Sequence, residues 1–353
     1  MSTVHRIKTG GFEGDIASFD QASRLRAIMS EAAHESLPPG QPASHDPPAM
    51  RLTRPAARVV TIASGKGGVG KTNVAVNLCI ALAQGGANAI LVDADLGLAN
   101  ADVLCGLTPN RRLERLVDHT RSEQWGDEFD LQDEALKGMA SIAVEAPGGF
   151  RLIPGAMGVA EMADLSPVMH RAIVNGLAEI ESDSDVVVVD TAAGLSGGVT
   201  SFFDAADLGV IVTTPEPTSI ADAYALIKCV RLMTPGNSCE TVSRAGPTPL
   251  ALLINQVTGP HEAKRVHQRV NAVAVKFLGC RIPMLGWIRQ DEAVGIAVRR
   301  RKPFLLHSPK SMASKDIRTV ATSLSRILSI TPVLQGGQRR RGDLGRIFRM
   351  VRS

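Results

Sequence analysis

The chain has 353 residues, of which 44% are hydrophobic and 21% are charged, and only twelve are aromatic (9 Phe, 2 Trp and 1 Tyr). So few aromatic side chains argue against a protein that binds single-stranded nucleic acid, because such proteins stack bases on aromatic rings. The five cysteines include no C-x-x-C pair and suggest neither a disulfide framework nor a zinc site, and no apolar run reaches the ~18 residues of a membrane span.

Two segments at the start of the chain are predicted to lie outside the globular body. Residues 1–35 begin without the apolar stretch of a secretory signal, so a cytoplasmic protein is expected. Within them, Asp20 can cap a short helix with Ala22 and Leu25 on its apolar face. Residues 36–57 contain six prolines and are interpreted as a linker. A helix on such a tether can dock in a partner's groove or fold against its own domain.

Residues 58–330 are predicted to form the body, in which apolar runs typical of strands alternate with helical patterns. Runs such as VVVVD at residues 186–190 are apolar without interruption, as expected of strands that helices cover on both faces. The prediction is an α/β fold with a doubly wound, mostly parallel sheet, helices on both faces, and ligands at the carboxyl ends of the strands. The strand candidates are Arg58–Ser64, Asn88–Asp93, Phe150–Pro154, Val186–Asp190, Leu208–Thr214, Leu250–Asn255 and Ile282–Trp287.

The segment after the first predicted strand fits the phosphate-binding pattern of a P-loop NTPase, G-x-x-x-x-G-K-[ST]. It follows the apolar run RVVTIAS and opens the helical pattern NVAVNLCIALAQ. Glycines let backbone N–H groups turn toward phosphate oxygens, and the helix N-terminus adds positive potential. Lys71 is expected to neutralise the β- and γ-phosphates, and the Thr72 hydroxyl to coordinate Mg²⁺. The predicted nucleotide-binding residues here are Gly65, Lys66, Gly67, Gly68, Val69, Gly70, Lys71, Thr72 and Asn73.

Acidic residues end two of the predicted strands and are candidates for holding magnesium. Asp93 ends the second predicted strand, with Asp95 two residues later, and Asp190 ends the run VVVVD. A carboxylate at the tip of a buried strand can hold Mg²⁺ through bound waters, or it can cap the turn that follows. Beside a phosphate loop the magnesium role is favoured. Thr72, Asp93 and Asp190 are therefore the predicted metal residues.

Two other stretches of the body carry no predicted site. Residues 118–149 are acidic and irregular, and they are predicted to form an excursion on the surface. The segment from Gly194 to Gly198 fits G-x-S-x-G, the pattern of a hydrolase nucleophile elbow. However, Asp190 ends the strand four residues earlier and a phosphate loop is already present. A nucleotide-sensing loop is therefore favoured over a serine hydrolase.

The net charge of +4 is concentrated at the end of the chain. Residues 336–353 contain six Arg and one Asp, a net +5, which leaves −1 for the remainder. Residues 331–338 are interpreted as a second linker, and residues 339–353 as a basic amphipathic helix suited to an anionic membrane surface. One copy is too short to bind strongly, whereas two copies in a dimer gain avidity; a helix packed on its own domain or an unordered basic tail is the alternative. The predicted membrane-binding residues are Leu344, Ile347, Phe348 and Val351 on the apolar stripe, with Arg346 and Arg349 beside it.

The phosphate loop carries a family resemblance. Lys66, directly after Gly65, makes the sequence K-G-G-x-G-K-T, which resembles the deviant Walker A motif of the MinD/ParA/NifH ATPases. The resemblance implies that ATP, together with Mg²⁺, closes a face-to-face homodimer in which Lys66 reaches the partner's nucleotide. It also implies that Asp95 positions the attacking water and that Asp190 is the Walker B magnesium residue. The expected catalytic residues are thus Lys66, Lys71 and Asp95.

The same resemblance assigns the base of the nucleotide. It implies that Asn255, at the end of a later strand, contacts adenine, and that the loop Ile288–Asp291 is a second candidate for this contact. ATP rather than GTP is expected also because the sequence Asn255-Gln256-Val257-Thr258 does not fit the guanine-binding motif N-K-x-D.

Within this family, the chain is similar to the flagellar-number regulators called FlhG or FleN. The likeness spans about residues 58–330, departs at residues 118–140, and rests on KTNVAVNLCIALA at 71–83, TTPEPTSIADAYALIK at 213–228 and LGWIRQDEAVGIAVRRRKPFL at 285–305. The segment at residues 20–26 resembles the element with which those proteins activate a signal-recognition-type GTPase, FlhF. The residues expected to bind this partner are Asp20, Gln21, Ala22, Leu25 and Arg26; flagellar basal-body and transcription-regulator proteins are further candidate partners.

These features together predict a slow ATPase that depends on dimerisation and sets flagellar number or placement. It is expected to alternate between an ATP-bound dimer on the inner face of the cytoplasmic membrane and an ADP-bound monomer in the cytosol. The alternatives are a ParA-like or MinD-like ATPase that positions DNA or the division machinery, and a scaffold with a degenerate site. The run Arg299–Lys302 would serve DNA as a phosphate-binding patch, but a solvated surface run is favoured, so DNA is not an expected partner.

Overall fold

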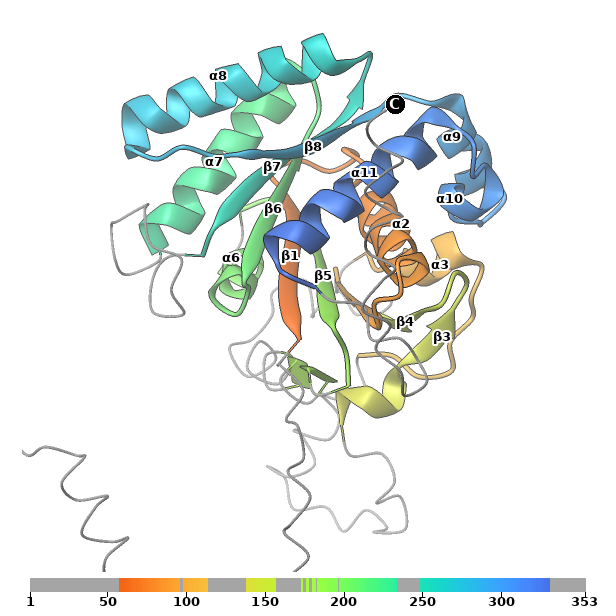
Figure 1. Ribbon diagram of the computed structural model, residues 1–353. Helices are drawn as coiled ribbons and strands as arrows, with labels where there is room; N and C mark the ends of the chain where they lie inside the picture. The colour runs from red at the N-terminus through yellow and green to blue at the C-terminus, as the bar shows by residue number, and fades with distance from the viewer. Residues whose placement is uncertain are drawn as a thin grey trace, which may run out of the picture. The chain divides into compact units, whose positions relative to one another are not determined.

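The computed structural model describes residues 57–330, apart from residues 96–97, 114–137, 157–172, 174–175, 178–179, 182, 196 and 234–247 (Figure 1). The helix predicted within residues 1–35, the first linker up to residue 56, the second linker and the basic C-terminal helix lie outside the described residues. The candidate residues for partner binding and membrane binding therefore stay predictions. None of the described helices is long and apolar enough to cross a membrane.

The described core is an eight-stranded sheet in the order β3-β4-β2-β5-β1-β6-β7-β8. Neighbouring strands pair in parallel except at one edge, where β3 pairs antiparallel to β4. The predicted mostly parallel sheet is therefore confirmed, and each of the seven predicted strands is found with its ends shifted by three residues or fewer. The strands are β1 (Arg58–Ser64), β2 (Ala89–Ala94), β3 (Val144–Ala146), β4 (Phe150–Ile153), β5 (Val186–Ala193), β6 (Leu208–Thr213), β7 (Leu250–Val257) and β8 (Met284–Arg289).

Helices cover both faces of this sheet, as Figure 1 shows with α7 and α8 on one face and α2 and α11 on the other. Side chains of β1 divide between the two faces: Val60 and Ile62 join the cluster that includes α2 and α11, whereas Ala63 joins the cluster of α6, α7 and α8. The helices are α2 (Lys71–Gln84), α3 (Ala101–Cys105), the 3₁₀ helix η2 (Met139–Ile142), α6 (Gly197–Asp204), α7 (Pro217–Met233), α8 (Pro260–Leu278), α9 (Glu292–Arg299), α10 (Phe304–His307) and α11 (Met312–Ile327). Burial on both faces explains why the strand runs are apolar without alternation.

The prediction of a surface excursion over residues 118–149 is wrong for its last third. Residues 138–149 contain η2 and β3, and the side chains of Met139 and Ile142 are buried in the core. β3 turns back at Gly148 and Gly149 to pair with β4. A strand of three residues is too short to show a period of two, so the sequence carried no strand signal there.

Candidate functional site

The phosphate loop connects β1 to α2 and is shaped by glycines with positive φ. Gly68 and Gly70 have φ of 82° and 86°, values that residues with a Cβ rarely adopt. A Cβ on Gly70 would also lie 2.6 Å from Asn255 Nδ2. Val74 N donates to Gly70 O as α2 begins, so the N–H groups of residues 71–73 lie ahead of the helical hydrogen-bond ladder. They form a ready site for an anion.

Lys71 and Asp190 form a buried ion pair below this loop. Lys71 Nζ donates to Asp190 Oδ1 over 2.6 Å, and the two side chains are 7% and 0% exposed. β5 brings Asp190 here because it pairs with β1 in parallel, opposite Ile62. Burial raises the pKa of the Asp190 carboxyl, and the Lys71 ammonium and the Thr72 hydroxyl oppose that shift. The pair keeps a cation and an anion side by side where phosphates and a metal are expected.

The chemistry of Asp190 fits a magnesium site. Among the described residues, Asp190 Oδ2 is buried and has no hydrogen-bond partner, and an unsatisfied buried oxygen is costly unless a ligand completes it. Thr72 opens α2 beside Asp190 and supplies a second oxygen. Mg²⁺ prefers a few carboxylate and hydroxyl oxygens and keeps several waters. Thr72 and Asp190 would therefore hold it.

Asp93 occupies a structural position at the end of β2. Its Oδ2 accepts from the N–H groups of Asn100 and Ala101, each at 3.0 Å, and its Oδ1 accepts from Asp95 N at 3.2 Å. Burial raises the pKa of Asp93 to about 7, with the charge of Asp190 adding to the effect. The capping interpretation of Asp93 thus has direct geometric support, because the carboxylate organises the start of α3; its role toward magnesium stays a prediction.

Asp95 lies in a more open environment than Asp93. Its Oδ1 accepts from Leu98 N over 3.1 Å, and the Leu98 side chain is 77% exposed. Asp93 is buried, whereas Asp95 itself is half-buried. Its expected role in positioning the attacking water is compatible with this exposure and stays a prediction.

The Lys66 side chain contacts residues at the start of α7. Its Nζ donates to Glu216 Oε2 over 2.8 Å and to Thr218 Oγ1 over 3.1 Å. Both members of the ion pair are solvated, with side chains of Lys66 and Glu216 that are 40% and 63% exposed. Sequence reasoning did not single out Glu216 or Thr218, because these residues lie about 150 positions from Lys66 and no local spacing links them.

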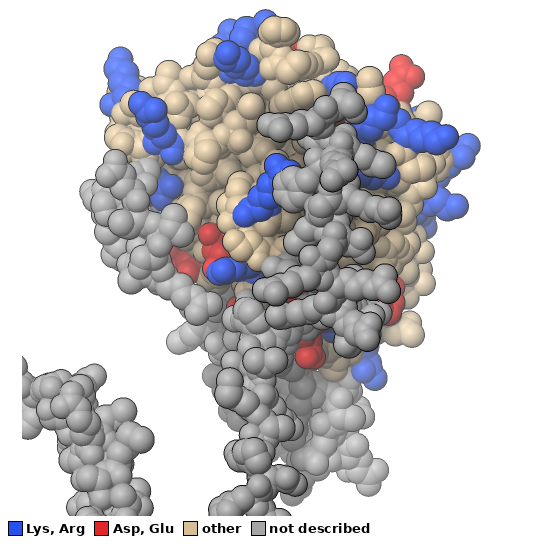
Figure 2. All heavy atoms as spheres, viewed as in Figure 1, with Lys and Arg blue, Asp and Glu red and all other residues tan. Residues whose placement is uncertain are grey.

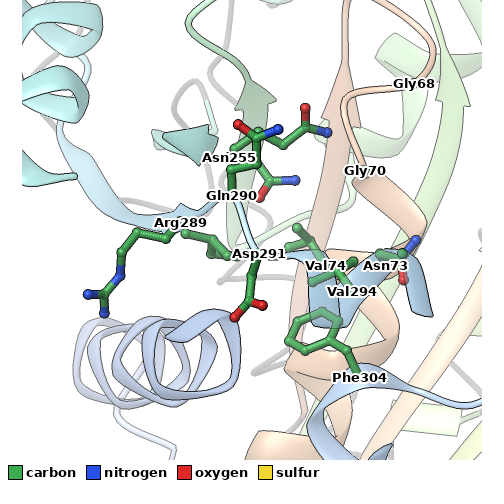
Figure 3. A pocket seen from close by; sticks show the side chains of 13 residues that line it. Gly68, Gly70, Asn73, Val74, Asn255, Arg289, Gln290, Asp291, Val294 and Phe304 are labelled. Atoms are coloured by element: carbon green, nitrogen blue, oxygen red, sulfur yellow. The ribbon is translucent and has the colours of Figure 1, made fainter. Parts of the chain in front are cut away.

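A cavity of about 350 Å³ continues from the phosphate loop and has the size of a small-molecule site. Figure 3 shows the amide side chains of Asn255 and Gln290 at one end and the apolar side chains of Val74, Val294 and Phe304 at the other. Asn255 Nδ2 donates to Val69 O over 2.8 Å, which fixes the amide against the phosphate loop. The structure thus brings Asn255 and the loop Ile288–Asp291 into one pocket wall, whereas the contact with adenine stays a prediction.

Two carboxylates, those of Asp316 and Asp291, connect the pocket loop Ile288–Asp291 to α11. Asp316 accepts from Arg289 N, Nε and Nη2 at 3.0, 2.8 and 2.6 Å. Asp291 caps α9 by accepting from Ala293 N and also accepts from Ala313 N, over 2.9 and 3.1 Å. The sequence indicated the loop but gave no sign that Asp316 would anchor it.

Comparison with known proteins agrees with this geometry. The sequence model of one family, described as the CobQ/CobB/MinD/ParA nucleotide binding domain, matches residues 60–304. The chain belongs to this family. It is 39% identical to the antiactivator FleN of Pseudomonas aeruginosa over 75% of this chain and 85% of that protein, and 32% identical to the flagellum site-determining protein YlxH of Helicobacter pylori over 75% and 80%. The septum site-determining protein MinD of Pyrococcus horikoshii, solved with Mg-ADP, shares the fold with a TM-score of 0.58 and 19% identity over 78% of this chain and 98% of that one.

The chain is accordingly an ATPase that uses ATP with Mg²⁺. Backbone N–H groups at the start of α2 lie where phosphate oxygens are expected, and Lys71 is predicted to neutralise the charge of those oxygens. When bound, Mg²⁺ stabilises the charge that develops on the transferred phosphoryl group. The ion pair with Asp190 fixes the position of the Lys71 ammonium group. Positioning and electrostatic stabilisation supply most of the catalysis in phosphoryl transfer, and these residues would provide both.

Proposed function

We propose that this chain is an ATP-driven switch that sets the number or placement of flagella. The observation that carries the proposal is the similarity to FleN, an antiactivator, over 75% of the chain at 39% identity. The similarity to YlxH, a flagellum site-determining protein, points to the same process. Both relatives are matched over at least 80% of their own length, so the likeness concerns most of each protein.

The switch would operate through an ATP-dependent homodimer. The exposed position of Lys66 supports this, because a solvated ion pair such as Lys66–Glu216 contributes only about 0–1 kcal/mol and exchanges readily. Lys66 can therefore leave its own α7 and reach a nucleotide in a second subunit. Hydrolysis is then slow in the monomer, because the site lacks this lysine until two chains meet.

The two ends of the chain would couple the nucleotide state to membrane binding and to partner binding. The stripe of Leu344, Ile347, Phe348 and Val351, with its arginines, suits the cytoplasmic face of the membrane, and a dimer would present two such stripes. The segment at residues 20–26 would bind a signal-recognition-type GTPase. The protein is thus proposed to be cytoplasmic and reversibly peripheral on the membrane.

The first test is genetic and uses full-length variants in the organism that carries the gene. Deletion should change the number or position of flagella, and the wild-type chain should restore them. Lys71→Ala should fail to restore them and stay a cytosolic monomer, whereas Asp95→Ala should bind ATP and accumulate as a membrane-bound dimer. Unchanged flagella after deletion would contradict the proposal, and an identical distribution of the two variants would contradict the switch.

The second test addresses the GTPase partner directly. GTP turnover by the organism's flagellar signal-recognition-type GTPase is measured with the wild-type chain and with a variant carrying Gln21→Ala and Leu25→Ala. We expect stimulation by the wild type and its loss in the variant. Equal turnover with both would remove this partner and favour a MinD-like or ParA-like positioning role.

A further inference from the structure

A basic turn joins α9 to α10, and the acidic residues that flank it in the sequence are Glu292 and Asp316. Residues 293–315 contain Arg299, Arg300, Arg301, Lys302, Lys310 and Lys315 and no Asp or Glu. The four cations from 299 to 302 are all exposed, and within the described residues none of them forms an ion pair. Figure 2 shows blue side chains gathered over the α9–α10 region at the right of the view.

Exposed apolar side chains accompany these cations. Val298, which precedes the basic run, is 37% exposed, and Leu306, on α10, is 36% exposed. We call Arg299–Lys302 together with Val298 and Leu306 the basic corner. This surface offers both cations and aliphatic groups, the two kinds of contact that an anionic lipid surface uses.

The backbone of the basic corner places an arginine where glycine is usual. Arg301 N donates to Val298 O and Lys302 N donates to Ala297 O, the bond pattern of a Schellman turn that ends α9. Arg301 has a φ of +50°, in the left-handed region that glycine fills without strain. The Schellman turn fixes the backbone that carries the exposed cations.

The basic corner is flanked in the sequence by residues that line the nucleotide pocket. It lies between Gly295 and Phe304, and both of these residues line the nucleotide pocket. The carbonyl of Arg301 also backs onto Gly106, where an added Cβ would lie 2.9 Å from it. Gly106 ends α3, the helix whose start Asp93 organises. The basic corner therefore adjoins both the pocket and the end of α3.

We propose that the basic corner is a second membrane-contact site, which binds anionic phospholipid headgroups when the ATP-bound protein lies on the membrane. The inference rests on the membrane switch of the proposed function and adds a contact from the folded domain to that of the C-terminal segment. Guanidinium and ammonium groups bind the headgroup phosphates, and Val298 and Leu306 enter the boundary with the acyl chains. DNA phosphates would use the cations equally well but give no role to the aliphatic side chains, so lipid is the occupant that fits the whole surface.

The test uses the full chain with ATP and compares two variants of equal charge. The corner variant carries Arg300→Gln, Arg301→Gln and Lys302→Gln, and it spares Arg299 because that side chain approaches Gly295 of the pocket. The matched control carries Lys264→Gln, Arg265→Gln and Arg269→Gln, three exposed positions on α8. ATP affinity of both variants should equal that of the wild type, which shows that they are folded.

Binding is measured by co-sedimentation with vesicles of phosphatidylglycerol in phosphatidylcholine and with vesicles of phosphatidylcholine alone. Each cation near an anionic surface strengthens binding roughly fivefold, so the corner variant should bind the anionic vesicles about 100-fold more weakly. The control should stay within a few fold of the wild type. Equal binding by the corner variant and the control would overturn the inference, as would a selective loss of plasmid DNA binding with vesicle binding intact. A wild-type chain that fails to bind anionic vesicles would instead refute the membrane part of the proposed function.

Discussion

Replacing Asp316 should loosen the nucleotide pocket from a position outside it. Asp316→Ala removes three hydrogen bonds to Arg289, two of them from the guanidinium. The Asp316 and Arg289 side chains are 8% and 26% exposed, so solvent screens the pair only in part. A hydrogen bond to a charged group contributes about 1.5–3 kcal/mol. Because Arg289 regains water when released, we take the lower end, about 1.5 kcal/mol, for each of the two guanidinium bonds and expect a loss of about 3 kcal/mol.

Two measurements check this expectation. Thermal unfolding of the full chain should shift downward by roughly 6–12 °C, because about 1 kcal/mol shifts a domain of this size by 2–4 °C. ATP affinity should fall roughly tenfold, since re-ordering even one loop residue costs about 1–2 kcal/mol. Lys315→Ala, an exposed neighbour on α11, is the control. If Asp316→Ala unfolds and binds ATP as the control does, α11 does not hold the pocket loop.

Three further predictions address the phosphate loop and its neighbours. Gly70→Ala should destabilise the chain by about 1–2 kcal/mol in urea unfolding and weaken ATP binding, because φ is +86° and the new Cβ would meet Asn255; unchanged affinity would argue against this loop geometry. Glu216→Gln should free Lys66 and raise the rate of ATP-dependent dimer formation in stopped-flow light scattering, with little change in stability; a slower rate would contradict the exchange of Lys66 between partners. For Asp93, the pKa is raised from 3.8 in the unfolded chain to about 7 in the fold. Between these two pH values Asp93 is protonated in the folded state and ionised in the unfolded state. The free energy of unfolding without nucleotide should therefore fall as pH rises from about 4 to about 7. Urea titrations of Asp93→Asn should lack that slope, and a wild-type slope of opposite sign would refute the assignment.

The strands and the phosphate loop were predictable because their signals are local. An apolar run such as VVVVD reports burial on both faces, and the spacing of Gly65, Gly70 and Lys71 reports a turn built for phosphate. The ends of strands shifted by a few residues because capping and pairing, rather than hydrophobicity, decide where a strand stops.

The parts that the sequence did not predict depend on contacts between distant segments. Lys66 meets Glu216 and Arg289 meets Asp316 only after the sheet order is set, and no periodicity records such a pairing. The burial of Met139 was not predicted for a different reason. Met139 lies in a single 3₁₀ turn among small residues, so no apolar run marks it. Tertiary packing, and not the local sequence pattern, determines such short elements and long-range contacts.

The buried ion pair of Lys71 and Asp190 links the binding of nucleotide to the binding of metal. A phosphate that recruits Lys71 leaves the Asp190 carboxylate without its cation at a position that is 0% exposed, and an uncompensated buried charge is strongly unfavourable. A divalent cation that binds together with the phosphate compensates the negative charge of Asp190. Nucleotide and metal should therefore bind with positive cooperativity, so that ATP stripped of its metal is a far weaker ligand than the pair.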